Sequence, residues 1–143
     1  MMRLSFNSMG STMANVWAVS AGIGLGGFVG SLCRYGLAIT FARLAPTLPI
    51  GTLAANMLGC LAIGLIMALV ERNALLSPAL RLALATGFCG GFTTMSSFIY
   101  EVAQMIRGNE YLEATLYLIG TLLLSILAFW AGTVLGKLIG GGA

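Results

Sequence analysis

The sequence contains no histidine and no aspartate, and only 8% of its 143 residues are charged. Without histidine, the chain lacks the side chain that most often serves as a general base and as a metal ligand. Its four acidic residues are all glutamates, and neither a catalytic pair of carboxylates nor a phosphate-binding loop is present. We therefore expect a protein that is not an enzyme.

The scarcity of charge also argues against a soluble protein, because soluble domains carry roughly 25% charged residues. Here 59% of the residues are hydrophobic, and the mean hydropathy is +0.99. The net charge is only +3, with no run of lysines and arginines, so no nucleic-acid partner is expected. The composition predicts an all-α integral membrane protein surrounded by the lipid bilayer.

A membrane-spanning helix needs about 20 mostly apolar residues, and four segments reach that length. They run from about 16 to 41, 50 to 70, 78 to 105 and 111 to 138. The short connections predict four helices that run up and down within a single domain, residues 16–143. Residues 1–15 are polar, and we expect them to form a flexible N-terminal extension.

Small residues and weakly biased charges both favour an oligomer. Gly22, Gly26 and Gly30 recur at the four-residue spacing that lets membrane helices approach closely. The basic residues divide almost evenly between the two predicted sides of the membrane: Arg3, Arg72, Arg81 and Lys137 on one, and Arg34, Arg43 and Arg107 on the other. Because the positive-inside rule then gives no clear orientation, the chain can insert both ways and form an antiparallel dimer.

One side-chain amide, that of an asparagine, lies inside the second span. Asn56, in the stretch GTLAANMLG, offers two donor hydrogens and one acceptor oxygen. It can hold two helices together by a hydrogen bond, or it can donate to an anion in a pore, and the sequence alone does not choose between these roles.

The third span is predicted to break. Residues 87–98 read GFCGGFTTMSSF and include three glycines, each of which costs a helix interior roughly 1 kcal/mol relative to alanine. Irregular backbone at membrane depth is tolerated only inside protein or beside a cavity. A break frees carbonyls that can hold a cation and amides that can face an anion. The alternative is a tight helix crossing that needs small residues.

Three hydroxyls follow in the last span. Tyr117, Thr121 and Ser125 are spaced one turn apart on one helical face, where they form either a polar track or bonds back to their own helix. Arg34 can reach the headgroups, pair with a carboxylate or attract anions. Glu101 can pair with an arginine, and the sequence leaves its role open.

Three of these stretches together resemble the Fluc (CrcB) family of fluoride channels. They are GFVGSLCR, GTLAANMLG and GFCGGFTTMSSF, and the resemblance extends from about Gly22 to Trp130. It implies small four-helix subunits that form antiparallel, dual-topology homodimers with two fluoride pores. It also implies a central structural sodium ion held by backbone carbonyls. Fluoride would leave the cytoplasm passively across the inner (plasma) membrane, which would spare the cell its toxicity.

The resemblance assigns roles to individual residues. Asn56 matches a pore asparagine, and Phe98 matches the second phenylalanine of a box whose ring edges face the ion. Met95 stands where most members have the first phenylalanine. The other pore positions are Ser96, Ser97, Tyr117, Thr121 and Ser125; the vestibule position is Arg34; the sodium positions are Gly90 and Thr93. We expect Met95 to line a conductive pore, because its flexible side chain ends in a methyl of slight positive character.

Two other functions remain compatible with the sequence. A small dual-topology exporter of cationic compounds would exchange protons for substrate at a carboxylate deep in the membrane. The first span has no acid, however, and Glu101 lies towards the end of the third. A non-transporting scaffold would explain the glycines but leave the polar track unused. Dependence on a proton gradient would separate an exporter from a channel.

Overall fold

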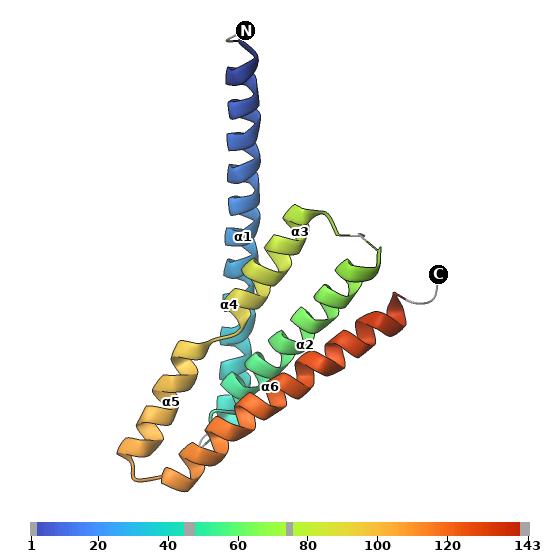
Figure 1. Ribbon diagram of the computed structural model, residues 1–143. Helices are drawn as coiled ribbons and strands as arrows, with labels where there is room; N and C mark the ends of the chain where they lie inside the picture. Colours follow the sequence, from blue (N-terminus) through green and yellow to red (C-terminus); the bar gives the residue numbers. More distant parts are fainter. Residues whose placement is uncertain (1–2, 45–47, 74–75, 141–143) are drawn as a thin grey trace.

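The computed structural model describes residues 3–44, 48–73 and 76–140, and every regular element within these ranges is helical. Three long helices are α1 (Arg3–Leu44), α2 (Ile50–Asn73) and α6 (Tyr111–Ile139). The third span is divided into α3 (Pro78–Leu82), the π-helical segment η1 (Ala83–Cys89), α4 (Gly90–Phe92) and α5 (Met95–Arg107). Figure 1 shows the chain changing direction between α4 and α5.

Four segments of the described chain are long and apolar enough to cross a membrane. They are Asn15–Leu44, Ile50–Glu71, Pro78–Arg107 and Tyr111–Ile139. The predictions of four spans and of a broken third span are therefore confirmed.

The first helix is longer than a span requires. Its 42 residues, at about 1.5 Å each, extend about twice the ~30 Å thickness of the hydrocarbon core, and its N-terminal part projects beyond the other helices (Figure 1). This part includes most of the segment 1–15, which we expected to be a flexible extension. The division of the chain at residue 15 stays a prediction.

Glycines let α2 and α6 pack closely along most of their lengths (Figure 1). A Cβ atom on Gly64 would collide with the carbonyl oxygen of Phe129, and one on Gly132 would collide with that of Leu61. Backbone therefore meets backbone across this crossing, as small residues allow in membrane helices.

Glycines also let α1 pack closely against the third span. A Cβ atom on Gly26 would collide with the Ala83 carbonyl oxygen, and one on Gly30 would collide with the Phe88 carbonyl oxygen. The predicted close approach at this glycine spacing is thus confirmed for Gly26 and Gly30, and it fixes the segments that precede the helix break.

Candidate functional site

The helix break falls at two threonines that directly follow the glycine-rich stretch. Thr93 (φ −83°, ψ 156°) and Thr94 (φ −149°, ψ 121°) both have extended backbone. Thr93 Oγ1 donates to the Cys89 carbonyl at 2.9 Å. Thr94 Oγ1 accepts from the Ser97 amide at 3.2 Å and so caps the first turn of α5. The break is thus a defined turn with local hydrogen bonds on both sides.

Asn56 clamps this break from the neighbouring helix α2. Its Oδ1 accepts from the Thr94 amide at 2.8 Å, and its Nδ2 donates to the Thr94 carbonyl at 3.1 Å. The interhelical hydrogen bond expected as one alternative for Asn56 is therefore present. Because the amide nitrogen carries two hydrogens, one donor is left for another group.

The break also frees the two carbonyls that were expected to hold sodium. In an uninterrupted helix, the Gly90 carbonyl would accept from the Thr94 amide and the Thr93 carbonyl from the Ser97 amide. These amides donate instead to Asn56 Oδ1 and Thr94 Oγ1. Gly90 is exposed, and outside its own helix backbone and chain neighbours no atom lies within 4 Å of the place where its Cβ would be. Freed backbone carbonyls of this kind suit a sodium ion.

A pocket of about 440 Å³ lies beside the break, between α2, α5 and α6; we call it the central pocket. It is lined by Asn56, Cys60, Ile63, Thr93, Thr94, Met95, Phe98, Thr121, Leu122, Ser125, Ile126 and Phe129. Five of the eight expected pore residues are in this set: Asn56, Met95, Phe98, Thr121 and Ser125. The structure therefore brings together residues that are up to 69 positions apart in the chain (125 − 56).

The other expected pore residues lie around this pocket rather than in its lining. The Ser97 hydroxyl accepts from Thr94 Oγ1 at 3.1 Å, and the Ser96 hydroxyl is 3.3 Å from the same atom. The Tyr117 ring packs edge-on against Phe98, with centroids 5.2 Å apart and planes at 63°. Phe98 is only 3% exposed, so this contact fixes the orientation of its ring.

Two hydroxyls in the central pocket lack a partner. Thr121 Oγ1 and Ser125 Oγ are buried and make no hydrogen bond within 3.5 Å in the described chain, although the Tyr117 hydroxyl is close enough to Thr121 to interact with it. Leaving a buried donor or acceptor unsatisfied costs about 1–3 kcal/mol. The alternative that these hydroxyls bond back to their own helix is therefore wrong, whereas Thr133, on the same helix, does donate to the Phe129 carbonyl at 3.0 Å.

The role of Glu101 is open in the sequence, and no pattern there singles out Thr52, yet the structure joins both to Tyr117. Thr52 Oγ1 donates to Glu101 Oε1, and Tyr117 Oη donates to Glu101 Oε2, each at 2.7 Å. The available signal was spacing: Thr52 precedes Asn56 by one helical turn, as Tyr117 precedes Thr121. This triad continues the polar faces of α2 and α6 beyond the central pocket.

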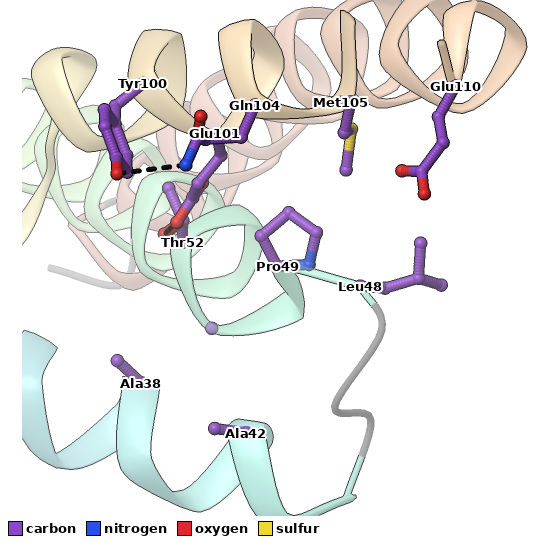
Figure 2. A pocket seen from close by; sticks show the side chains of 11 residues that line it. Ala38, Ala42, Leu48, Pro49, Thr52, Tyr100, Glu101, Gln104, Met105 and Glu110 are labelled. Atoms are coloured by element: carbon purple, nitrogen blue, oxygen red, sulfur yellow. Dashed lines mark hydrogen bonds between the residues drawn. The ribbon is translucent and has the colours of Figure 1, made fainter. Parts of the chain in front are cut away.

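Beyond the triad lies a second pocket of about 450 Å³, to which α1, α2 and α5 contribute. Figure 2 shows Thr52 and Glu101 meeting in its wall, with Gln104 and Tyr100 nearby. Glu110 adds a second carboxylate to the lining. The triad thus stands between the polar face of the central pocket and this second pocket near the helix ends.

Arg34, on α1, contacts the third span just before the break. Its Nε donates to the Gly91 carbonyl at 3.2 Å, and the Ser31 hydroxyl donates to the same oxygen at 3.4 Å. The guanidinium is thus held against the third span. Its expected vestibule role stays a prediction.

Comparison with known proteins shows a family match over most of the chain. The family described as CrcB-like protein, Camphor Resistance (CrcB), matches residues 21–133. The fluoride-specific ion channel FluC of Chlorobium phaeobacteroides (strain BS1) is 47% identical over 116 residues, which cover 81% of this chain and 91% of the relative. Proteins of the same name from Prosthecochloris aestuarii (strain DSM 271 / SK 413) and Nitratidesulfovibrio vulgaris (strain DSM 19637 / Miyazaki F) are both 43% identical. The matched segments cover 80% and 82% of this chain, and 90% and 95% of the relatives. The chain is a multi-pass membrane protein that belongs to the CrcB (Fluc) family.

Proposed function

We propose that this protein is a passive, fluoride-selective channel that lets fluoride leave the cytoplasm through the inner (plasma) membrane and so protects the cell. The observation that carries the proposal is the pair of unpartnered hydroxyls at Thr121 and Ser125, which share a pocket with the Asn56 amide. Buried donors are costly unless something accepts their hydrogen bonds, and a small anion is such an acceptor. The relatives named fluoride-specific ion channel FluC support the choice of anion.

Selectivity follows from replacing the water around the ion. Fluoride is small and strongly hydrated, so a pore must offer hydrogen-bond donors in place of water. Thr121, Ser125 and the second amide hydrogen of Asn56 supply them, and the Phe98 ring can present its electropositive edge. Chloride is larger, and donors spaced for fluoride would hold it poorly.

The proposal includes a structural sodium ion. The freed carbonyls of Gly90 and Thr93 are the atoms that would hold it, supported by the diverted amides of Thr94 and Ser97. When bound, the ion supplies a buried positive charge, which attracts anions strongly where the dielectric constant is low. Asn56 and Thr94 would keep the carbonyls in place.

The proposal also includes an antiparallel homodimer. Gly90 is exposed and Met95 is 64% exposed in the single chain, although they flank broken backbone at membrane depth. Such backbone must be covered by protein or line a cavity. A second copy of the chain would cover it, and it would also cover part of the exposed apolar surface of α1 and α6.

The experiment is fluoride efflux from liposomes that contain the purified protein, with a potassium ionophore present and chloride efflux measured in parallel. The proposal expects fast fluoride efflux, no comparable chloride efflux and no need for a proton gradient. Well-folded protein that releases no fluoride would refute it. Transport that stops when the proton gradient is removed would indicate the exporter instead.

A further inference from the structure

We propose that the backbone amide of Met95, at the N-terminus of α5, is a further hydrogen-bond donor to fluoride in the central pocket, an inference that rests on the proposed channel function. The helix break separates four amides from the carbonyls that they would bond in an unbroken helix. They are the amides of Thr94, Met95, Ser96 and Ser97. The contacts of these four amides show which of them remain free to bind an anion.

Two of the four amides have partners within the chain. The Thr94 amide donates to Asn56 Oδ1 at 2.8 Å, and the Ser97 amide donates to Thr94 Oγ1 at 3.2 Å. The amides of Met95 and Ser96 make no hydrogen bond in the described chain. Every helix start leaves donors of this kind, but these two lie within a membrane span, where an unsatisfied backbone group is costly.

The usual partner of the Met95 amide is taken by other groups. In an unbroken helix this amide would donate to the Gly91 carbonyl. That oxygen instead accepts from Arg34 Nε at 3.2 Å and from the Ser31 hydroxyl at 3.4 Å. The third span therefore does not need the Met95 amide for this carbonyl, and the amide is free for a ligand.

An independent observation points to an anion at the same place. Met95 lines the central pocket together with Thr121, whose side chain is only 3% exposed and whose Oγ1 makes no hydrogen bond within 3.5 Å. One small acceptor can satisfy both this buried hydroxyl and the amide. The positive end of the dipole of α5, a helix of 13 residues, favours an acceptor that is negatively charged.

A backbone donor also fits the methionine that stands where the resemblance implies a phenylalanine. Every residue except proline supplies an amide hydrogen, so the side chain at position 95 can change without loss of this donor. Truncation of the Met95 side chain should therefore slow fluoride less than removal of the Met95 amide does.

The first test removes the amide and keeps the side chain. In the full-length protein, Met95 is replaced by its α-hydroxy acid analogue, which puts an ester oxygen where the N–H was. We expect fluoride efflux from liposomes to slow by about tenfold, because a hydrogen bond to a charged group is lost. Fluoride should also raise the melting temperature of this protein by less than that of the unmodified protein, because a ligand stabilises the state that it binds.

The matched control is the same ester at Leu112, in the first turn of α6 and outside the central pocket. An ester also weakens the preceding carbonyl as an acceptor. The two positions are alike in this respect, because the Thr94 carbonyl accepts from Asn56 and the Tyr111 carbonyl accepts from Thr115. Efflux through the Leu112 ester protein should be unchanged.

Met95→Pro repeats the test by mutagenesis, with Met95→Ala as the reference that lacks the same side chain but keeps the amide. Proline suits the first residue of a helix, as Pro78 does at the start of α3. The extended backbone of Thr94 (φ −149°, ψ 121°) suits the residue before a proline. Efflux should be about tenfold slower in Met95→Pro than in Met95→Ala, at similar melting temperatures.

Three results would overturn the inference. Equal efflux through the Met95 ester and unmodified proteins would show that the amide does not meet the ion. A Met95 ester protein that melts well below the Leu112 ester protein without fluoride would show that the amide bonds to protein, such as the second copy. Equally slow efflux in Met95→Pro and Met95→Ala would assign the effect to the side chain. Absence of fluoride efflux from the unmodified protein would instead refute the proposed channel function.

Discussion

Replacing Ser125 by alanine should move stability and transport in opposite directions. Ser125 Oγ is buried without a hydrogen-bond partner in the described chain, so its removal breaks no bond of the protein. An unsatisfied buried polar group costs about 1–3 kcal/mol. Ser125→Ala should therefore leave the melting temperature unchanged or raise it, by about 2–4 °C for each kcal/mol recovered.

Fluoride efflux should fall in the same variant. A hydrogen bond to a charged group is worth about 1.5–3 kcal/mol, which corresponds to about a 10- to 150-fold change in rate if that bond compensates dehydration at the barrier. Thr133→Val is the matched control, because the Thr133 hydroxyl is bonded to the Phe129 carbonyl and lies outside the central pocket. Its efflux should be unchanged.

The two measurements are initial fluoride efflux from liposomes and thermal unfolding in detergent. A Ser125→Ala protein that is destabilised by more than about 1 kcal/mol would show that the hydroxyl has a partner in the assembled protein. Unchanged efflux would show that Ser125 does not meet the ion. Either result would refute the reasoning from unpartnered hydroxyls.

Three further changes test other contacts. Asn56→Leu removes both bonds to Thr94 and should lower stability by about 2–5 kcal/mol, measured by thermal unfolding; an unchanged melting temperature would contradict the clamp. Glu101→Gln replaces one of the two carboxylate oxygens that accept hydrogen bonds with an NH2 donor, and it should lower the free energy of unfolding by about 1–3 kcal/mol in the same assay. Fluoride efflux is measured alongside, and no change in either stability or efflux would show that the hydrogen bonds of Glu101 contribute to neither. Gly132→Ala should separate α2 from α6 and lower the melting temperature, whereas Gly120→Ala, with open space around it, should not; equal melting temperatures would contradict the close crossing.

The sequence was sufficient for the helical fold of the single chain because the relevant signals are long and local. Four apolar stretches of about 20 residues allow little besides four spans, and the glycines at 87, 90 and 91 indicated a break. The break itself lies a little further along, at Thr93 and Thr94. The position of the break depends on the side-chain amide of Asn56. Because Asn56 lies on α2, the composition of the third span does not reveal this contact.

The site was predictable in part. Hydroxyl spacing placed Thr121 and Ser125 on one face, and the resemblance added Met95 and Phe98, which have no such periodicity. Glu101 was undecided because its bonds to Thr52 and Tyr117 join three different helices. Contacts of this kind follow from how the helices cross, which is set by backbone approach at glycines rather than by the polar residues themselves.

The clamp between Asn56 and Thr94 has a consequence for the speed of transport. Alternating-access carriers must rearrange helices in every cycle, on a microsecond-to-millisecond timescale. Sliding α5 past α2 here would break two hydrogen bonds at once, at 2.8 and 3.1 Å, in a setting where water does not replace them. Because Asn56, which we propose to face the ion, also holds the backbone still, the structure favours a static conduit. Transport through it would be limited by dehydration of the ion rather than by motion of the protein.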